Sequence, residues 1–248
     1  MRYMTTQEIL ARAANAKFSL ATAATDLKNR ALLAMADSLI QESGEILAAN
    51  GRDMERARGR ISDVMLDRLQ LTPARLAAMA DGIRTVADLP DPVGVVLRRV
   101  QRPNGLHIEK RTVPMGVIAI IYESRPNVTA DAAALSLKAG SACVLRCGRD
   151  AWESCHAIVS ALRKGLESVG LIGDLIGFVE DTSHSGAQEL MTAVGLVDLL
   201  IPRGGKKLIQ TCVEQATVPC IQTGTGICHI YVDRDANLDM ALIIIENA

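Results

Sequence analysis

One uninterrupted apolar run, residues 117–122 (VIAIIY), constrains the fold of this chain more than any other feature. A strand with one face in water alternates apolar and polar residues, whereas a strand buried on both faces does not. The run therefore predicts a central strand of a parallel sheet that is covered on both sides.

Segments of strand and helix character alternate from Pro114 onwards. Repeated strand–helix–strand units require right-handed crossovers and form a doubly wound parallel sheet, so the fold class predicted is α/β. The predicted strands are 117–122, 142–146, 176–179, 197–201, 218–222 and 227–233, and the predicted helices between them are 129–139, 150–169, 186–194 and 206–216.

The first 89 residues have a different pattern and are predicted to be helical from residue 5. Apolar residues recur at helical spacing, and Thr72-Pro73 is a preferred helix start, with a hydroxyl cap followed by proline. Two strand-like runs then flank Asn104-Gly105, which is a typical hairpin turn. The chain is thus predicted to divide into a helical layer at 1–94, a β-hairpin at 95–111 and an α/β region at 112–248.

Composition excludes several classes of protein. Hydrophobic residues make up 49% of the 248 residues and charged residues 22%, which argues against a disordered chain. The net charge of 27 − 28 = −1 and the few aromatic residues (1 Trp, 3 Tyr, 2 Phe) predict no nucleic-acid partner and no membrane-surface partner. No apolar run is long enough to cross a bilayer. The spacings of the 6 cysteines match no zinc template and suggest reduced thiols, so we expect a cytoplasmic protein with no metal site.

The segment Pro202-Arg203-Gly204-Gly205-Lys206 carries the strongest chemical signal. It ends a predicted buried strand and begins a predicted helix, and exposed N–H groups at a helix start bind phosphate well. An ordinary tight turn is the alternative, because glycine pairs are common in turns and neither of the usual glycine-rich phosphate-binding motifs is present.

A second signal, Glu123-Ser124-Arg125-Pro126-Asn127, follows the central strand, where ligands bind in open α/β sheets. Arg125 suits a carboxylate or phosphate, and the Asn127 amide suits a developing oxyanion. The alternative for Asn127 is a simple helix cap.

Three further stretches are predicted to be structural. Gly224 and Gly226 mark a bend, while Cys228 and His229 point to opposite faces of a strand and cannot pair. The charged segment 52–60 is predicted to be a solvated helix end. The apolar helical stripe near the C-terminus has no stop signal, so we expect that the sequence is cut there.

Taken together, these stretches resemble the gamma-glutamyl phosphate reductase (glutamate-5-semialdehyde dehydrogenase) family of proline biosynthesis, within the aldehyde dehydrogenase superfamily. The resemblance extends over the whole chain. The matching residues are Leu66-Asp67-Arg68-Leu69, Leu71-Thr72-Pro73-Ala74-Arg75-Leu76, Val113-Pro114-Met115-Gly116-Val117-Ile118, Tyr122-Glu123-Ser124-Arg125-Pro126-Asn127-Val128-Thr129, Ile201-Pro202-Arg203-Gly204-Gly205 and Cys228-His229-Ile230-Tyr231-Val232-Asp233.

The resemblance implies an oxidoreductase that uses NADPH to reduce L-glutamate 5-phosphate to L-glutamate 5-semialdehyde. In this family a cysteine thiolate attacks the acyl phosphate, phosphate leaves, and the resulting thioester is reduced. It also implies an aldehyde-dehydrogenase-like fold, whose hairpin at 95–111 belongs to the oligomerisation region of a full-length homo-oligomer.

The resemblance further implies roles for individual residues. Asn127 matches the residue that helps to form the oxyanion hole, and Arg125 is expected to bind the substrate. Arg146 matches a strand-end residue that contacts the cofactor ribose or its phosphate, although Cys147 stands where the family commonly has glycine. Three consecutive residues are expected to face the cofactor pyrophosphate: Arg203, Gly204 and Gly205.

The nucleophilic cysteine of the family lies in a Thr-Gln-Arg-Pro-Ser-x-Cys stretch expected just after Ala248, and this stretch is not in the sequence. We expect the catalytic domain to be absent after residue 248. The chain is then either part of an NADPH-dependent reductase, as a truncation or one half of a split enzyme, or a non-catalytic nucleotide-binding remnant. Arg146 and Arg203 alone do not decide between NADPH and NADH. An apolar surface left uncovered by the missing part predicts self-association, which a monodisperse monomer would contradict.

Overall fold

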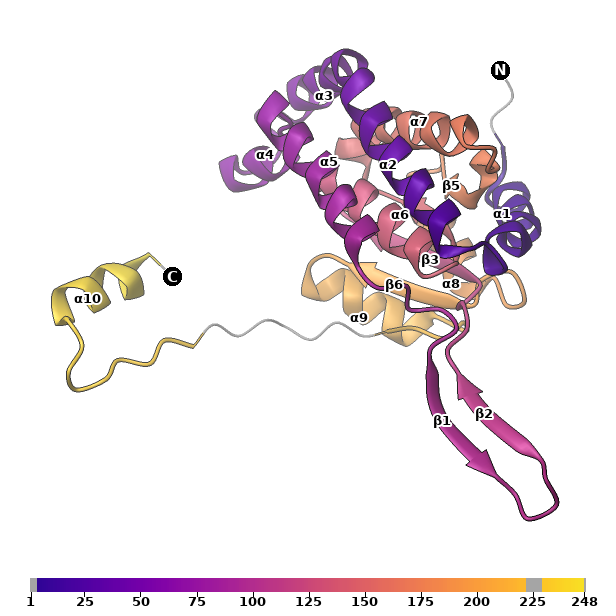
Figure 1. Cartoon of the computed structure of the whole chain (residues 1–248). Coiled ribbons are helices and arrows are strands. Elements are labelled where there is room, and N and C mark those ends of the chain that lie inside the picture. The colour runs from indigo at the N-terminus through magenta and orange to yellow at the C-terminus, as the bar shows by residue number, and fades with distance from the viewer. Residues whose placement is uncertain (1–3, 222–228, 248) are drawn as a thin grey trace.

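A four-stranded parallel sheet lies at the centre of the chain in the computed structural model, which describes residues 4–221 and 229–247 (Figure 1). The strand order is β5-β4-β3-β6, and all residues of β3 are buried, which confirms the predicted central strand. The strands are β3 (Val117–Tyr122), β4 (Ala142–Arg146), β5 (Ile176–Phe178) and β6 (Leu199–Arg203).

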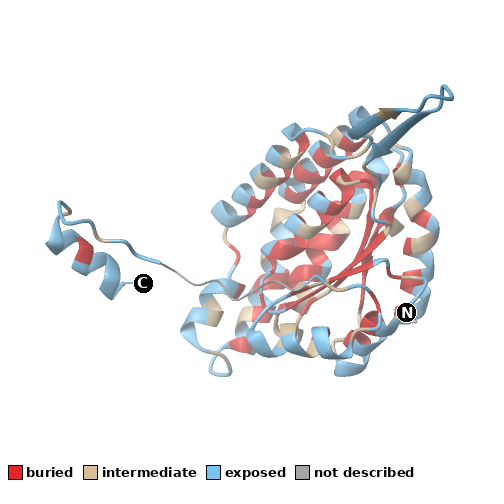
Figure 2. Ribbon diagram, turned by 90° about the horizontal axis from the view of Figure 1, so that it is seen from below, coloured by how far each residue is buried: buried red, intermediate tan, exposed pale blue. Residues whose placement is uncertain are grey.

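Helices cover both faces of this sheet (Figure 2). One face carries the crossover helices α6 (Asn127–Lys138) and α7 (Trp152–Ser168), and short 3-10 turns η1 (Arg149–Ala151) and η2 (Gly173–Leu175) precede α7 and β5. The other face carries α1 (Thr6–Ala21), α8 (His184–Thr192) and α9 (Lys206–Gln215). This is the doubly wound α/β architecture expected from the sequence.

The remaining N-terminal helices form an outer layer that packs on α6 and α7 (Figure 1). Thr72 caps α5 by accepting a hydrogen bond from the Arg75 amide, as the Thr-Pro start predicts. The continuous helical stretch predicted from the sequence is divided here into separate helices, because turns interrupt it. The outer helices are α2 (Thr25–Gln41), α3 (Ser43–Ala57), α4 (Asp63–Leu69) and α5 (Pro73–Asp88).

The predicted hairpin is confirmed as β1 (Val96–Gln101) and β2 (His107–Arg111), an antiparallel pair that projects from the body (Figure 1). Gly105 at its turn has a φ of 84°, a left-handed conformation that favours glycine. At its base, the Gly94 amide donates to the Thr112 carbonyl oxygen at 3.0 Å. The two ends of the hairpin are therefore joined to each other.

The last two predicted strands are not formed within the described residues. Cys220 makes only an isolated bridge with Leu200, and residues 229–233 have no strand partner to complete a ladder. Gln222, Gly224, Gly226 and Cys228 lie outside the described residues. The following helix, α10 (Leu238–Glu246), begins at the Asn237 cap and lies apart from the body with most of its apolar side chains exposed (Figure 1).

Self-association through this exposed surface stays a prediction. Within the described parts of the chain, no helix combines the length and apolarity needed to cross a membrane.

Candidate functional site

The two segments with the strongest chemical signals meet at the edge of the sheet where β3 and β6 end. Tyr122 and Arg203 are neighbours in the parallel register of these strands. Beyond them, the Gly205 amide donates a hydrogen bond to Glu123 Oε2 at 3.0 Å. The strand order reverses between β3 and β6, since the chain moves outward through β4 and β5 before it returns. This is the switch point at which open α/β sheets bind ligands.

The turn between β6 and α9 allows close approach of a ligand to the backbone. A Cβ atom on Gly204 would lie 2.8 Å from the Glu123 carboxyl carbon and 2.8 Å from Leu208 Cδ2. Gly205 is the N-cap residue of α9 and supplies no side-chain cap. The amide at the start of α9 therefore donates to the Glu123 carboxylate in place of a capping side chain. An anion is favourable there because the N-terminal end of a helix is partly positive.

The loop after β3 places Arg125 and Asn127 in the wall of one cavity, with a volume of about 460 Å³. The N-cap of α6 is Pro126, and Asn127 is the first helical residue, so the alternative role of Asn127 as a cap is wrong. Its exposed amide instead donates to Asp131 Oδ2 at 3.4 Å. The side-chain amide thus lies in the cavity wall with one N–H directed to Asp131.

Asp131 was not found by sequence reasoning, although its position one helical turn after Asn127 was a usable signal. It lines the 460 Å³ cavity and also a second one of about 370 Å³, which Arg203 shares. Desolvation among the surrounding atoms raises the pKa of the Asp131 carboxyl, while the Asn127 hydrogen bond and the Arg203 charge partly offset that rise. The carboxyl therefore links the Asn127 loop to the end of β6.

Two arginines from the outer helical layer complete the larger cavity. Arg75 is fixed by hydrogen bonds to the Gln70 carbonyl oxygen at 2.8 Å and to Asp67 Oδ1 at 2.8 Å. Within the described residues, the Arg68 side chain donates a hydrogen bond to the Met65 sulfur at 3.8 Å and has no ion pair. Arg68 and Arg125 thus bring two guanidinium groups to the cavity that Asn127 lines.

Arg146 lies at the end of β4, beside Ile121 of β3 in the register. One of its terminal nitrogens donates to the carbonyl oxygens of Thr182 at 2.7 Å and Ser183 at 2.9 Å. Burial lowers the pKa of this guanidinium from its usual value. The side chain therefore holds the segment before α8, and it is not brought into the cavity of Arg125 and Asn127.

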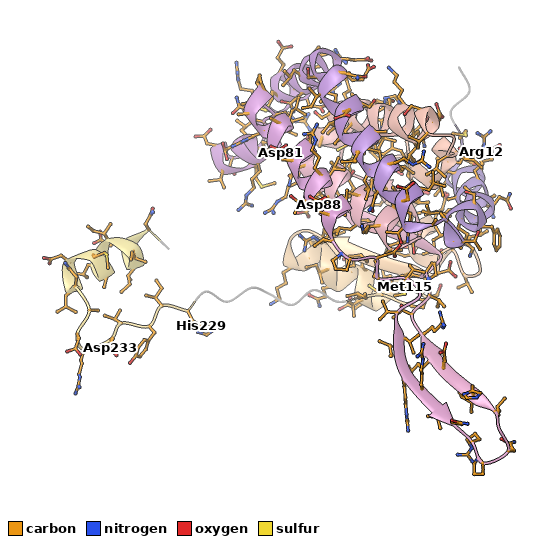
Figure 3. All side chains as sticks on the ribbon, viewed as in Figure 1. Arg12, Asp81, Asp88, Met115, His229 and Asp233 are labelled. Atoms are coloured by element: carbon orange, nitrogen blue, oxygen red, sulfur yellow. The ribbon has the colours of Figure 1, made fainter. Side chains whose placement is uncertain are left out.

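The described thiols are structural rather than reactive. Burial raises the pKa of Cys143 to about 12 and, with a contribution from Cys220, that of Cys212 to about 11, and it also raises the pKa of Cys147. A protonated thiol is a poor nucleophile, so these cysteines suit core packing. His229 lies on the segment that leads to α10, away from the sheet (Figure 3), and no metal-binding cluster occurs among the described residues.

The chain is similar to known proteins over almost all of its length. A gamma-glutamyl phosphate reductase of Streptococcus suis (strain 05ZYH33) is 56% identical over 244 residues, which cover 98% of this chain and 59% of the relative. One of Neisseria meningitidis serogroup C is 58% identical over 243 residues, covering 98% and 58%. Almost the whole of this chain is thus similar to part of the gamma-glutamyl phosphate reductases. No family model matches the chain.

Solved structures of the family share the fold described above. The gamma-glutamyl phosphate reductase of Thermotoga maritima superimposes with a TM-score of 0.90 at 40% identity, over 98% of this chain and 59% of that one. An acetylating aldehyde dehydrogenase of Geobacillus thermoglucosidasius has a TM-score of 0.69 at 19% identity, over 87% and 44%, and shows the likeness of fold alone. The chain thus has an aldehyde-dehydrogenase-like fold and spans about 59% of the length of its reductase relatives.

Proposed function

We propose that this chain is the nucleotide-binding part of an NADPH-dependent gamma-glutamyl phosphate reductase. The observation that carries the proposal is the meeting of the β3 and β6 loops at the switch point, where Glu123 already places a carboxylate on the Gly205 amide. An internal anion at this place supports an anion-binding role for the start of α9. The similarity of the chain to family members supports the choice of nucleotide and substrate.

The residues at this turn fit the pyrophosphate of the cofactor. Gly204 and Gly205 present backbone without side chains, and Lys206 and Lys207 add positive charge at the start of α9. When bound, the nicotinamide supplies the hydride for reduction. The contribution of the chain is to hold the phosphate groups, for which Glu123 first leaves the Gly205 amide.

We propose that the 460 Å³ cavity binds the acyl phosphate. Arg125 and Arg68 provide guanidinium groups that pair with substrate anions. Asn127 donates its second amide N–H to the acyl oxygen, and Asp131 holds that amide through the 3.4 Å contact. The nucleophilic thiol comes from the family's cysteine stretch, which the 248 residues do not include. Turnover is therefore proposed for the chain together with a polypeptide that carries the stretch, assembled as a homo-oligomer through the hairpin.

A non-catalytic nucleotide-binding module is the second candidate. The observation that favours it is the set of protonated, buried thiols in the described residues. The two candidates share nucleotide binding and differ in turnover. Oxidation of glutamate semialdehyde with NADP⁺, measured with and without a polypeptide that carries the cysteine stretch, separates them. Turnover upon addition supports the reductase, and no turnover in either case supports the module.

A fluorescence titration of the chain with NADPH tests nucleotide binding itself. We expect saturable binding, which Lys206→Glu weakens about tenfold because it places a like charge beside the pyrophosphate. The matched control is Lys110→Glu on the hairpin strand β2, which makes the same charge change far from the turn. The absence of saturable NADPH binding to the unmodified chain would refute the proposed function.

A further inference from the structure

The β-hairpin projects from the body of the molecule and adds nothing to its core. No residue of β1 or β2 is buried, and among the described elements each strand packs extensively on the other alone (Figure 2). A two-stranded ribbon of this kind has no third strand or helix that would hold it in place. Its direction relative to the body is therefore set by the residues at its base.

A carboxylate at the base attaches the entering segment to α2. Asp91 Oδ2 lies 2.5 Å from Lys28 Nζ and accepts a hydrogen bond from the Thr25 hydroxyl at 2.7 Å. The other oxygen, Oδ1, accepts from the Val93 amide at 2.9 Å. Since Thr25 and Lys28 belong to α2, both oxygens of one side chain place the segment that leads into β1.

A second lysine extends this attachment to two further helices. Lys138, the last residue of α6, donates to Asn29 Oδ1 of α2 at 2.7 Å and to the Ala87 carbonyl oxygen of α5 at 2.7 Å. Lys28 Nζ donates to the Lys138 carbonyl oxygen at 3.4 Å. Desolvation lowers the pKa of the Lys138 ammonium, and the Asp91 charge opposes that fall. The Asp91 cluster, which consists of Thr25, Lys28, Asn29, Asp91 and Lys138, thus joins the hairpin base to α2, α5 and α6.

Both lysines of the Asp91 cluster are almost fully buried. Lys28 has 1% of its surface exposed and Lys138 has 3%, while the Asp91 side chain is 13% exposed. A buried ion pair adds little net stability compared with an apolar contact of the same volume, because both charges lose their water. Its hydrogen bonds nevertheless have fixed directions, which an apolar contact does not. The choice of charged groups here points to a role in orientation.

The strand that leaves the hairpin is oriented by the strand that enters it. The Thr112 hydroxyl donates to the Pro92 carbonyl oxygen at 2.6 Å and accepts from the Val95 amide at 2.9 Å. Because Pro92 directly follows Asp91, a shift of Asp91 moves both strands together. A second attachment is apolar: a Cβ atom on Gly140 would lie 2.9 Å from Pro114 Cγ.

We propose that the Asp91 cluster fixes the direction of the hairpin in the free chain, so that the hairpin is already oriented when it meets a second chain. Orientation before binding lowers the entropy that association costs. The oligomerisation role of the hairpin rests on the proposed function, whereas its fixed direction does not.

The experiment measures the distance between the hairpin and the body with two nitroxide spin labels. The labels are attached to added cysteines at Arg102→Cys, at the exposed turn of the hairpin, and at Ala77→Cys, on the exposed side of α5. Double electron–electron resonance then gives a distribution of distances, whose width reports how widely the hairpin moves. A sample without the added cysteines measures the labelling of the native thiols.

Asp91→Asn in the labelled chain is expected to broaden the distribution about twofold, because the base then moves as a loop does. The matched control is Asp81→Asn, which removes an exposed carboxylate that pairs with Arg84 at 2.9 Å on α5. This control is expected to leave the width unchanged. A narrow distribution in the unmodified labelled chain is part of the expectation, and a broad one would already contradict the proposal.

A second variant covers the case in which Asp91→Asn does not fold, since it leaves the buried Lys28 ammonium without its anion. Lys28→Met combined with Asp91→Leu removes both charges, and its urea midpoint is expected to stay close to that of the unmodified chain. The distribution is still expected to broaden, because Thr25 and Val93 lose their acceptor. A purely stabilising role of the ion pair would instead leave the width of this folded variant unchanged.

An unchanged width in every folded variant would overturn the proposal and assign the direction of the hairpin to the packing of Pro114 against Gly140. These measurements contain no nucleotide and no substrate. Their failure therefore leaves the NADPH titration as it stands, and a chain that does not bind NADPH would still show whether the Asp91 cluster orients the hairpin.

Discussion

At the scale of single residues, the contact between Glu123 and Gly205 occupies the backbone amide at the switch point. The carboxylate lies on the amide at the start of α9, and Gly204 has no side chain to keep it away. A carboxylate is a weaker match for this position than a phosphate, since it carries less charge and fewer acceptor oxygens. Under the proposed function, Glu123 is therefore an internal competitor of the nucleotide phosphate.

Glu123→Gln is expected to tighten the binding of NADPH and of inorganic pyrophosphate about fivefold, because a charge at a helix start is worth about 1 kcal/mol. Titration calorimetry of both probes measures the change. The matched control is Glu214→Gln, on the last turn of the same helix. Affinities equal to those of the unmodified chain would show that the carboxylate does not compete.

Sequence reasoning predicted where the candidate residues that follow directly from strand ends would lie. Arg125 and Gly204 come just after predicted strands, and parallel strands that share an edge bring such residues together. It missed Glu123 as a partner of Gly205. That contact depends on which strand lies beside β3, and local spacing does not contain that information.

At the scale of elements, the outer helical layer is fixed to the sheet by the close approach of α2 and α7. A Cβ atom on Gly165 of α7 would lie 2.6 Å from Met35 Cα and 2.7 Å from the Ala34 carbonyl oxygen, both backbone atoms of α2. A second attachment joins α3 to α7, where Asp53 accepts hydrogen bonds from the Ser154 amide at 2.7 Å and its hydroxyl at 2.6 Å. These contacts hold α2 and α3 against α7.

Gly165→Ala is expected to lower the free energy of unfolding by about 1–3 kcal/mol, because the helices separate to make room for the methyl group. The matched control is Gly82→Ala in α5, where a Cβ atom meets nothing within 4 Å. That change is expected to raise stability by about 0.5–1 kcal/mol through helix propensity. Urea unfolding of both variants measures the difference, and a neutral Gly165→Ala would contradict the close packing.

The sequence predicted the type of most elements, and it failed where pairing is not local. The hairpin was predicted because Asn104-Gly105 defines its turn within a few residues. The strand predicted at 227–233 has a suitable composition, but in the described residues 229–233 no neighbouring strand supplies hydrogen bonds. The composition of a segment favours extended backbone, but a β-strand forms only where a neighbouring strand supplies the hydrogen bonds.

At the scale of the whole molecule, the sheet and its covering helices form one core that contains several ionisable hydroxyl and thiol groups. Burial raises the pKa of the Tyr122 hydroxyl well above its usual value, with further contributions from Cys155 and Cys147. It also raises the pKa of Cys143 to about 12 and, with a contribution from Cys220, that of Cys212 to about 11. These groups stay protonated in the folded chain at pH values at which the unfolded chain loses its protons.

The free energy of unfolding is therefore expected to be fully retained below about pH 8.5, the ordinary thiol pKa, and to fall as the pH rises above it. Each such thiol contributes a slope of about 1.4 kcal/mol per pH unit between its unfolded and folded pKa values. Urea unfolding under reducing conditions from pH 8 to pH 10.5 measures the slope. Cys143→Ala is expected to lower it, and a slope that stays the same would show that Cys143 ionises freely in the folded chain.

The closed base of the hairpin has a consequence for engineering and for evolution. Because the Gly94 amide is hydrogen-bonded to the Thr112 carbonyl oxygen, the chain leaves and re-enters the body of the molecule at one place. The backbone of the body is therefore the same whether the segment between these residues is long, short or exchanged. The hairpin is thus an insert with a single point of attachment. A short turn in place of residues 96–111 should leave the sheet and its cavities intact, and a foreign domain grafted there would be carried at a distance from every site described above.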